Sequence, residues 1–341
     1  MNRRRFIRNA AGLMALPSAA SAAFLTISGE PKLRISSEEP EEPEGFDYYI
    51  SPTGSDSNSG TLASPWAITA LNSKHATYAG KRVGLLDGTY NVGGITPHGN
   101  GITLGPASGT SGQPTVIEAV NHGSVVLDHN HARPALMGRL DNSVQYIQIR
   151  GLKFIRCTEF GIFIRRDSGR IPGIVIDSCE FTQQTRSDEA DLTNGIFLQC
   201  TDDALVTNCY FHDIVNTQQA SSVSAILMYG TIGTVVERCT FESVYAGVHS
   251  KYAGGSPRTD DQSVTVRQCY FASNQFGCRG FDNKDQVSTP PSNAPYGPFV
   301  IEHNVFENCT QVLGNDGPYS SASPMIVRNN TVYANSSGAK Q

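Results

Sequence analysis

Four cysteines recur at intervals of 30 residues, and each is followed two positions later by a phenylalanine. The pairs are Cys179 with Phe181, Cys209 with Phe211, Cys239 with Phe241, and Cys269 with Phe271. A constant period of this length indicates a structural repeat, and the aliphatic segments and turn residues around it favour short β-strands. Each repeat is therefore expected to form one coil of a solenoid, in which stacked coils make residues distant in the sequence neighbours.

Each coil is expected to contain three strands. The β-branched residue five positions before each phenylalanine and the cysteine two positions before it are both expected to face inward. They are three apart, which one strand does not allow because its side chains alternate. A two-residue bend must therefore separate two short strands. The predicted bends are 177–178, 207–208, 237–238, 267–268 and 302–303.

A third strand is expected after each phenylalanine, and its outward face changes in character along the chain. The predicted strands are 161–165, 195–199, 225–229, 247–251 and 277–281. One outward row contains Phe163, Phe197, Leu227, His249 and Arg279, and the next contains Arg165, Gln199, Tyr229, Lys251 and Phe281. Solubility alone does not require an apolar face to become cationic within three coils, so this face is the candidate functional surface.

The chain is expected to contain an export signal, a linker and one folded domain. Residues 1–22 resemble a twin-arginine signal peptide, and the acidic Pro/Glu-rich residues 23–45 are expected to be a disordered linker. Residues 46–341 are the predicted all-β solenoid, with early coils at 83–90, 102–104 and 116–119 and a short capping helix within 66–78. We therefore expect a periplasmic, cell-surface or extracellular monomer.

The composition limits the partners of this domain. Without residues 1–22 the chain has 22 basic and 31 acidic side chains, a net charge of −9. Nucleic acid is then an unfavourable partner. Outside the N-terminus no run of 18 apolar residues occurs, so membrane insertion is not expected.

The eight cysteines have two possible interpretations. An exported protein often uses them as disulfides, whereas twin-arginine substrates generally fold before export in a reducing compartment. Stacking on successive coils favours buried thiols. Metal binding by the cysteines is not expected, because no Cys-x-x-Cys motif occurs.

The strand–bend–strand unit resembles the right-handed parallel β-helix of pectate-lyase-like proteins, in which asparagine often stacks at the bend, as Asn304 and Asn330 are placed to do here. The segments 247–255 and 280–283 resemble the region around the catalytic lysine of family-nine pectate lyases, although Lys251 is one residue further from its Gly-Gly pair. This resemblance implies a polysaccharide lyase that cleaves an acidic uronate polymer by β-elimination.

The resemblance also implies roles for particular side chains. Lys251 would be the base that removes the C5 proton of a uronate, Arg279 would be a cationic neighbour, and His249 would orient substrate or share proton transfer. Each role has an alternative. Lys251 could be a substrate-binding or merely solvated cation, Arg279 could pair with an acid such as Asp282, and His249 could be a packing residue. The side chains expected to bind the sugar chain are Arg165, Gln199, Tyr229, Phe281 and Lys284.

Calcium is the cofactor that the resemblance implies. Asp202 and Asp203 form an adjacent acidic pair, as in the family, but Val206 stands where a further aspartate is expected. Asp188, Glu189 and Asp191 in the preceding loop are candidates to complete the oxygen ligands. Ordinary turn acids are the alternative interpretation of the pair.

The loops 183–194, 213–224, 252–263 and 282–298 border the candidate face and are expected to form a groove suited to a polymer. Two other functions remain open. A glycoside hydrolase on this fold would need two carboxylates, and Asp202 and Asp203 are the candidates. A non-catalytic carbohydrate-binding or surface protein would need no base at Lys251.

Overall fold

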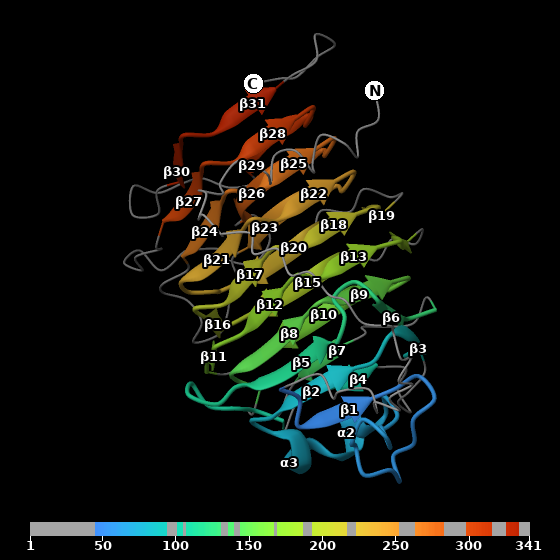
Figure 1. The fold of residues 1–341 in the computed structure, drawn as a ribbon. Coiled ribbons are helices and arrows are strands. Elements are labelled where there is room, and N and C mark those ends of the chain that lie inside the picture. The colour runs from blue at the N-terminus through green and yellow to red at the C-terminus, as the bar shows by residue number, and fades with distance from the viewer. Residues whose placement is uncertain are drawn as a thin grey trace, which may run out of the picture. The chain divides into compact units, whose positions relative to one another are not determined.

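The computed structural model describes residues 45–93, 101–104, 107–130, 136–139, 144–166, 169–186, 193–216, 223–251, 263–282, 298–315 and 325–333. Within them the chain winds into a stack of coils, which rises in Figure 1 from the blue strands at the bottom to the red strands at the top. Every strand pairing between coils is parallel. The prediction of an all-β parallel solenoid is confirmed.

Three long sheets of ten, nine and eight strands run along the stack, and each coil from β2 to β29 contributes one strand to each sheet. The first sheet contains β1 (Tyr48–Ile50), β2 (Arg82–Leu85), β5 (Thr115–Ala119), β8 (Ile147–Arg150), β12 (Val175–Asp177), β17 (Leu205–Thr207), β21 (Thr234–Glu237), β24 (Val264–Arg267), β27 (Phe299–Glu302) and β30 (Met325–Arg328). The second contains β3 (Gly88–Asn91), β6 (Val125–Asp128), β9 (Leu152–Ile155), β13 (Glu180–Thr182), β18 (Tyr210–His212), β22 (Thr240–Glu242), β25 (Tyr270–Ala272), β28 (Val305–Glu307) and β31 (Thr331–Tyr333). The third contains β4 (Ile102–Thr103), β7 (Leu136–Arg139), β10 (Phe160–Arg165), β15 (Asn194–Gln199), β20 (Ser224–Tyr229), β23 (Ala246–Lys251), β26 (Phe276–Asp282) and β29 (Gln311–Asn315).

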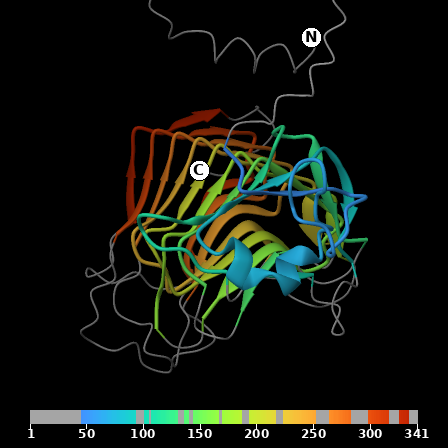
Figure 2. The same cartoon turned by 60° about the horizontal axis from the view of Figure 1, so that its bottom comes forward.

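Two small sheets lie at corners of the coils. They pair β11 (Ile171–Pro172) with β16 (Thr201–Asp202), and β14 (Gln184–Arg186) with β19 (Ile214–Asn216). Two short helices, α2 (Ala70–Ser73) and α3 (His75–Tyr78), lie at the N-terminal end of the stack (Figure 2) and bury Leu71 and Tyr78 in its core. The predicted cap is therefore present as two short helices rather than one.

The bend between the first and second sheets has the predicted length. Its second residue adopts a left-handed backbone in each regular coil, with φ between 53° and 57° at Ser178, Asn208, Arg238, Gln268 and His303. A single residue in this conformation redirects the chain sharply, which lets the side chains on both sides of the bend face the core.

The phenylalanines form a continuous column inside the second sheet. Neighbouring rings are nearly parallel, with centroids 4.6 to 5.0 Å apart, through Phe154, Phe181, Phe211, Phe241, Phe271 and Phe306. Glycines on the third sheet make room for these rings. A Cβ atom would lie 2.5 to 2.9 Å from a ring carbon at Gly161, Gly195, Gly247 and Gly277.

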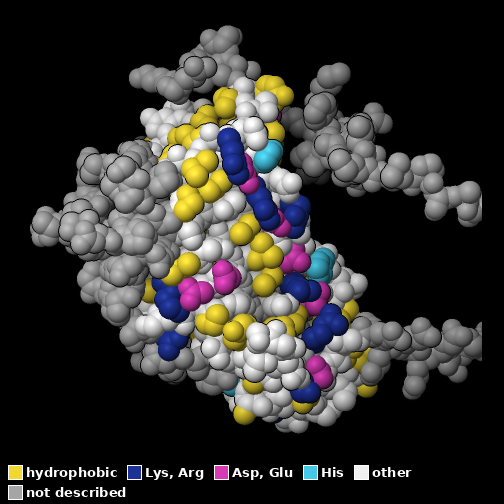
Figure 3. Space-filling view, turned by 90° about the vertical axis from the view of Figure 1, so that its left-hand side faces the viewer, with side chains coloured by type: hydrophobic (Ala, Val, Ile, Leu, Met, Phe, Trp, Pro, Cys, Tyr) yellow, Lys and Arg dark blue, Asp and Glu magenta, His cyan; other side chains and the backbone are white. Residues whose placement is uncertain are grey.

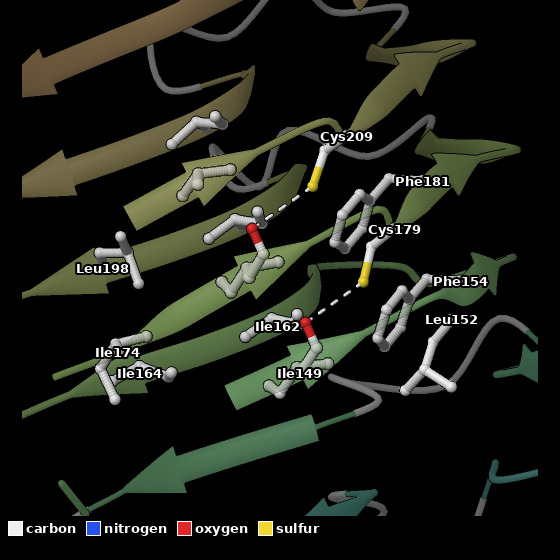
Figure 4. Packing of buried hydrophobic residues seen from close by; sticks show 14 of the residues in the cluster. Ile149, Leu152, Phe154, Ile162, Ile164, Ile174, Cys179, Phe181, Leu198 and Cys209 are labelled. Carbon is white, nitrogen blue, oxygen red and sulfur yellow. Dashed lines mark hydrogen bonds between the residues drawn. The ribbon is translucent and has the colours of Figure 1, made fainter. Parts of the chain in front are cut away.

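The repeated cysteines form a second buried column beside the rings. Each thiol donates a hydrogen bond to a main-chain carbonyl of the preceding coil at 3.7 Å, as Figure 4 shows for Cys179 and Cys209. Asn304 continues this column and donates to the equivalent carbonyl, that of Val266, at 3.0 Å. Its Oδ1 also accepts the N–H of Cys269 at 2.9 Å. All eight cysteines of the chain are buried.

An alternating row of charges runs along the outside of the bends, and it is visible in Figure 3 as a line of basic and acidic side chains. The strand register places the following residues side by side in this order: Glu118, Arg150, Asp177, Thr207, Glu237, Arg267, Glu302 and Arg328. We call them the charge ladder. Arg267 contacts Glu237 and Arg328 contacts Glu302, each at 2.7 Å.

The predicted signal peptide and linker, residues 1–44, lie outside the described residues. No helix in the described part of the chain has both the length and the hydropathy needed to cross a membrane.

Candidate functional site

The third sheet carries the candidate side chains on its outward face. The strand register aligns Phe163, Phe197, Leu227, His249 and Arg279 in one row. A second row contains Arg165, Gln199, Tyr229, Lys251 and Asp282. The first row is as predicted, and it brings His249 beside Arg279 on consecutive strands.

The second row differs from the prediction at its last member. Lys251 pairs with Asp282 rather than with Phe281, because the register shifts by one residue between His249 and Lys251. The strand β26 therefore contains one extra residue relative to β23, as in a β-bulge. The prediction that Phe281 lies opposite Lys251 is wrong. The side chain of Phe281 and all of Lys284 lie outside the described residues.

The early part of this face is apolar. Phe160, Phe163, Phe197 and Leu227 form a buried cluster separate from the main core, and Tyr229 packs against it. The Tyr229 ring meets the Phe197 ring edge-on, with centroids 5.2 Å apart. This contact orients Tyr229, whose backbone pairs with that of Lys251 on the next strand.

His249 is the transition point between the apolar and cationic parts of the face. Its side chain is fully buried, and neither ring nitrogen has a hydrogen-bond partner within the described part of the chain. Burial, together with the positive charges of Arg279 and Lys251, holds the pKa of His249 well below its usual value. His249 is therefore a neutral imidazole, and its burial separates it from direct contact with a polymer in this conformation.

Arg279 is also buried, with an exposed fraction of 6%. Its guanidinium carbon lies 4.8 Å from the centroid of the Phe276 ring, on the same strand. The strand register pairs Arg279 with Gly314 of the next coil. A guanidinium shielded from water attracts an anion more strongly than an exposed one, because the local dielectric constant is lower.

Lys251 is the last residue of β23 and is half-buried. The second row also contains Gln199, which is buried, and Arg165, which is half-buried. The structure therefore brings Arg165, Gln199, Tyr229 and Lys251 into one row across four consecutive strands. Most of the predicted groove-forming loops, at 187–192, 217–222, 252–262 and 283–297, lie outside the described residues.

Two of the predicted calcium ligands, Asp202 and Asp203, lie among the described residues, and each contacts a neighbouring segment of the chain. Asp202 accepts a hydrogen bond from Nε of Arg170 at 2.7 Å and forms an ion pair with the same guanidinium, in which Nη2 lies 2.6 Å from Oδ1. The same guanidinium also donates to the main-chain oxygens of Gly230 and Thr201, so it ties three coils together. Arg170 thus supplies the positive charge beside Asp202.

Asp203 does not complete a ligand set with its neighbour. Its backbone is left-handed, with φ of 51°, and its carboxylate lies over Gly233 of the following coil. Among the described residues no group of three His, Cys, Asp or Glu side chains is arranged to hold a metal ion. Asp188, Glu189 and Asp191 lie outside those residues.

Three residues that contact this region were not identified from the sequence. Arg170 lies 32 positions before Asp202, at a corner of the coil outside the repeat pattern. Phe276 and Gly314 contact Arg279 from β26 and β29. The separation of 35 residues between Arg279 and Gly314 departs from the 30-residue period, so the period alone does not pair them.

Comparisons with known proteins agree with the solenoid. The family model described as "Right handed beta helix region" matches residues 139–340. A rhamnogalacturonan lyase shares 16% identity, with a TM-score of 0.53, over 76% of this chain and 68% of that chain. Pectate lyase Pel9A shares 15% identity, with a TM-score of 0.49, over 85% and 78%. A lacto-N-biosidase from Eubacterium ramulus shares 12% identity, with a TM-score of 0.48, over 84% and 68%. No curated protein sequence matches the chain. At these identities the structural likeness concerns the fold alone.

Proposed function

Because the chain belongs to the family of right-handed β-helix proteins, we propose that it is an exported polysaccharide lyase that cleaves an acidic uronate polymer by β-elimination. Among the structural neighbours is a protein named as a rhamnogalacturonan lyase, which is compatible with this activity. The proposal depends, however, on the residues of the third sheet.

One observation carries the proposal. Lys251 and Arg279 lie on neighbouring strands of a face whose equivalent positions in earlier coils are apolar or neutral, apart from the paired Arg139 and Arg165. Two cations beside a neutral His249 suit a substrate that carries carboxylates at regular intervals. A merely soluble surface has no need to bury Arg279 among these side chains.

In the proposed reaction Arg279 binds the carboxylate of a uronate and stabilises the negative charge that develops when C5 loses its proton. Lys251, in its neutral form, takes that proton on Nζ. The electrons of the C5–H bond form the C4–C5 double bond, and the bond from C4 to the glycosidic oxygen breaks. That oxygen takes a proton from the lysine ammonium, which restores the neutral base.

His249 contributes in this scheme as a positioning residue. It lies between Leu227 and Arg279 in the row and stays uncharged, so it adds no third positive charge to the site. Tyr229, held by Phe197, and Gln199 and Arg165 in the second row are proposed to bind neighbouring sugars.

Calcium remains a proposal from the resemblance alone. The described residues do not fit it while Arg170 holds Asp202, so no step of the reaction is assigned to a metal.

The test is incubation of the purified protein with polygalacturonate, alginate and glycosaminoglycans, with and without EDTA, while the ultraviolet absorbance of the unsaturated product is followed. A rise in absorbance that is absent with Lys251→Ala supports the lyase. New reducing ends without absorbance would instead establish a hydrolase. Binding without any product would establish a carbohydrate-binding protein. Loss of activity in EDTA and its recovery with Ca²⁺ would assign the metal.

A further inference from the structure

The Arg279 side chain lies on an aromatic support within its own strand. Its guanidinium carbon is 4.8 Å from the centroid of the Phe276 ring, three residues earlier in β26. The same arrangement occurs in the apolar part of the sheet, where Phe163 packs on Phe160, also three residues earlier, with centroids 4.6 Å apart. Arg279 thus takes the position that Phe163 occupies in β10, and Phe276 takes the position of Phe160 beneath it.

The next coil leaves space for this pair. Gly314 of β29 is buried and pairs with Arg279 in the register. A Cβ atom at position 314 would lie 2.9 Å from Cγ of Arg279 and 3.0 Å from Cδ1 of Phe276. The contact with Arg279 would be closer than side-chain carbon atoms tolerate, and the contact with Phe276 would be tighter than most carbon contacts. The stem of Arg279 and the edge of the Phe276 ring therefore occupy the volume that any other residue at position 314 would fill.

We propose that Phe276 and Gly314 form a seat that fixes the Arg279 guanidinium, and that both are positioning residues for the binding of a substrate carboxylate. This inference rests on the proposed function in naming the carboxylate, whereas the seat itself is a property of the structure. A cation over an aromatic face is attracted by the ring quadrupole, and packing against the ring reduces the number of conformations that the long arginine stem can adopt.

The seat predicts the effect of one added methyl group at position 314 on the placement of Arg279. The backbone of Gly314 is not in the left-handed region, so alanine is compatible with its conformation. The nearest atoms to the added Cβ belong to the side chains of Arg279 and Phe276. Gly314→Ala should therefore move Arg279 off the ring while the coils keep their hydrogen bonds. Gly112 is the matched control, because a Cβ atom there meets nothing within 4 Å.

The first experiment detects the contact between Arg279 and Phe276 by NMR spectroscopy and does not depend on any enzymatic reaction. In protein labelled on arginine, the side-chain signals of Arg279, assigned through Arg279→Lys, should be shifted upfield by the Phe276 ring. Gly314→Ala and Phe276→Leu should each abolish that shift, and Gly112→Ala should preserve it. An Arg279 signal without a ring shift in the unmodified protein, or one unchanged by Gly314→Ala in a folded variant, would overturn the seat.

The second experiment uses the reaction. Gly314→Ala should lower kcat/KM by about 100-fold, the scale of loss for a misplaced binding group. In an Arg279→Ala background it should cause no further loss, because the seat acts only through Arg279. A further loss in that background would assign Gly314 a general structural role instead. If the ring shift is present and depends on Gly314 but no uronate polymer is cleaved, the seat stands and the lyase is refuted.

Discussion

Replacing Phe241 by alanine should be among the most destabilising single changes in this protein. Its ring is fully buried between those of Phe211 and Phe271, at centroid distances of 5.0 and 4.6 Å. Truncating a buried phenylalanine to alanine costs about 3–5 kcal/mol through lost burial and the cavity left behind. Phe306 offers a matched comparison, because it is equally buried but stacks in the described column on one ring alone, that of Phe271 at 4.7 Å.

The comparison isolates the contribution of one ring contact. On its other side Phe306 is covered by Val332, which is 49% exposed in the last coil. An aromatic pair contributes about 0.5–1.5 kcal/mol beyond burial. Phe241→Ala should therefore reduce the free energy of unfolding by about 0.5–1.5 kcal/mol more than Phe306→Ala does. The open end of the stack acts in the same direction, because water reaches a cavity there more easily.

Urea unfolding would measure both variants. Circular dichroism reports all coils, whereas fluorescence reports Trp66, the only tryptophan of the chain, at the N-terminal end. Coincident transitions would justify a two-state free energy. If they differ, amide hydrogen exchange in β22 and β28 gives the local opening free energies instead. An equal loss for the two variants, or a larger loss for Phe306→Ala, would refute the idea that ring stacking adds to burial in this column.

Three other predictions concern activity, packing and pH. Lys251→Ala should abolish cleavage of uronate polymers and retain binding of the polymer. The activity of the unmodified protein should rise toward alkaline pH, because a lysine that acts as a base must be neutral. An acidic optimum would exclude Lys251 as the base. Gly247→Ala should destabilise the fold by roughly 1–3 kcal/mol, as overpacking does, because its Cβ would lie 2.5 Å from the Phe271 ring. Urea unfolding with no loss of stability would contradict this prediction. Burial lowers the pKa of His212, but its hydrogen bonds to carboxylates raise it overall, and the His212 hydrogen bond lowers the pKa of Glu180. The contribution of His212 to the free energy of unfolding is therefore complete below about pH 6.5 and is lost as the pH rises through the higher pKa of the folded state. The contribution of Glu180 is complete above about pH 4.3 and is lost as the pH falls through the lower pKa of the folded state. His212→Gln should therefore lower the free energy of unfolding most between these two pH values, by roughly 0.5–1 kcal/mol. A loss of stability that is constant from pH 5 to pH 9 would contradict the link between His212 protonation and stability.

The repeated positions of the fold were predictable from the sequence because they obey one spatial requirement. Each coil must place a ring, a small polar side chain and a β-branched residue over the same groups in the coil before. That requirement produced the period of 30 at Cys179 and Phe181 and located the bends and strands correctly. The replacement of cysteine by Asn304 was predicted from the resemblance to β-helix proteins with asparagine at the bend. The structure gives the physical reason: Asn304 and Cys269 donate to equivalent carbonyls, those of Val266 and Val236, in their preceding coils.

The site was less predictable because it departs from the period. The extra residue in β26 moves Asp282 into the position expected for Phe281, and nothing in the residue types there indicates a bulge. The partner of Asp202 lies at a corner that the repeat does not describe. Burial of His249 also could not be inferred, since strand alternation says which face a side chain is on and not whether that face is covered.

The charge ladder bears on how a protein of this kind can change its length. Its members alternate in sign from Glu237 to Arg328, so duplicating one coil in that region would set two like charges side by side at the distance of paired strands. Duplicating two coils would preserve the alternation. Growth by a single coil is therefore easiest at the uncharged Thr207, whose hydroxyl accepts a hydrogen bond from Arg238, whereas loss of that coil would set Asp177 beside Glu237. The row of charges therefore favours growth by even numbers of coils along most of the stack, and Thr207 is the position where one extra coil adds no like-charge pair.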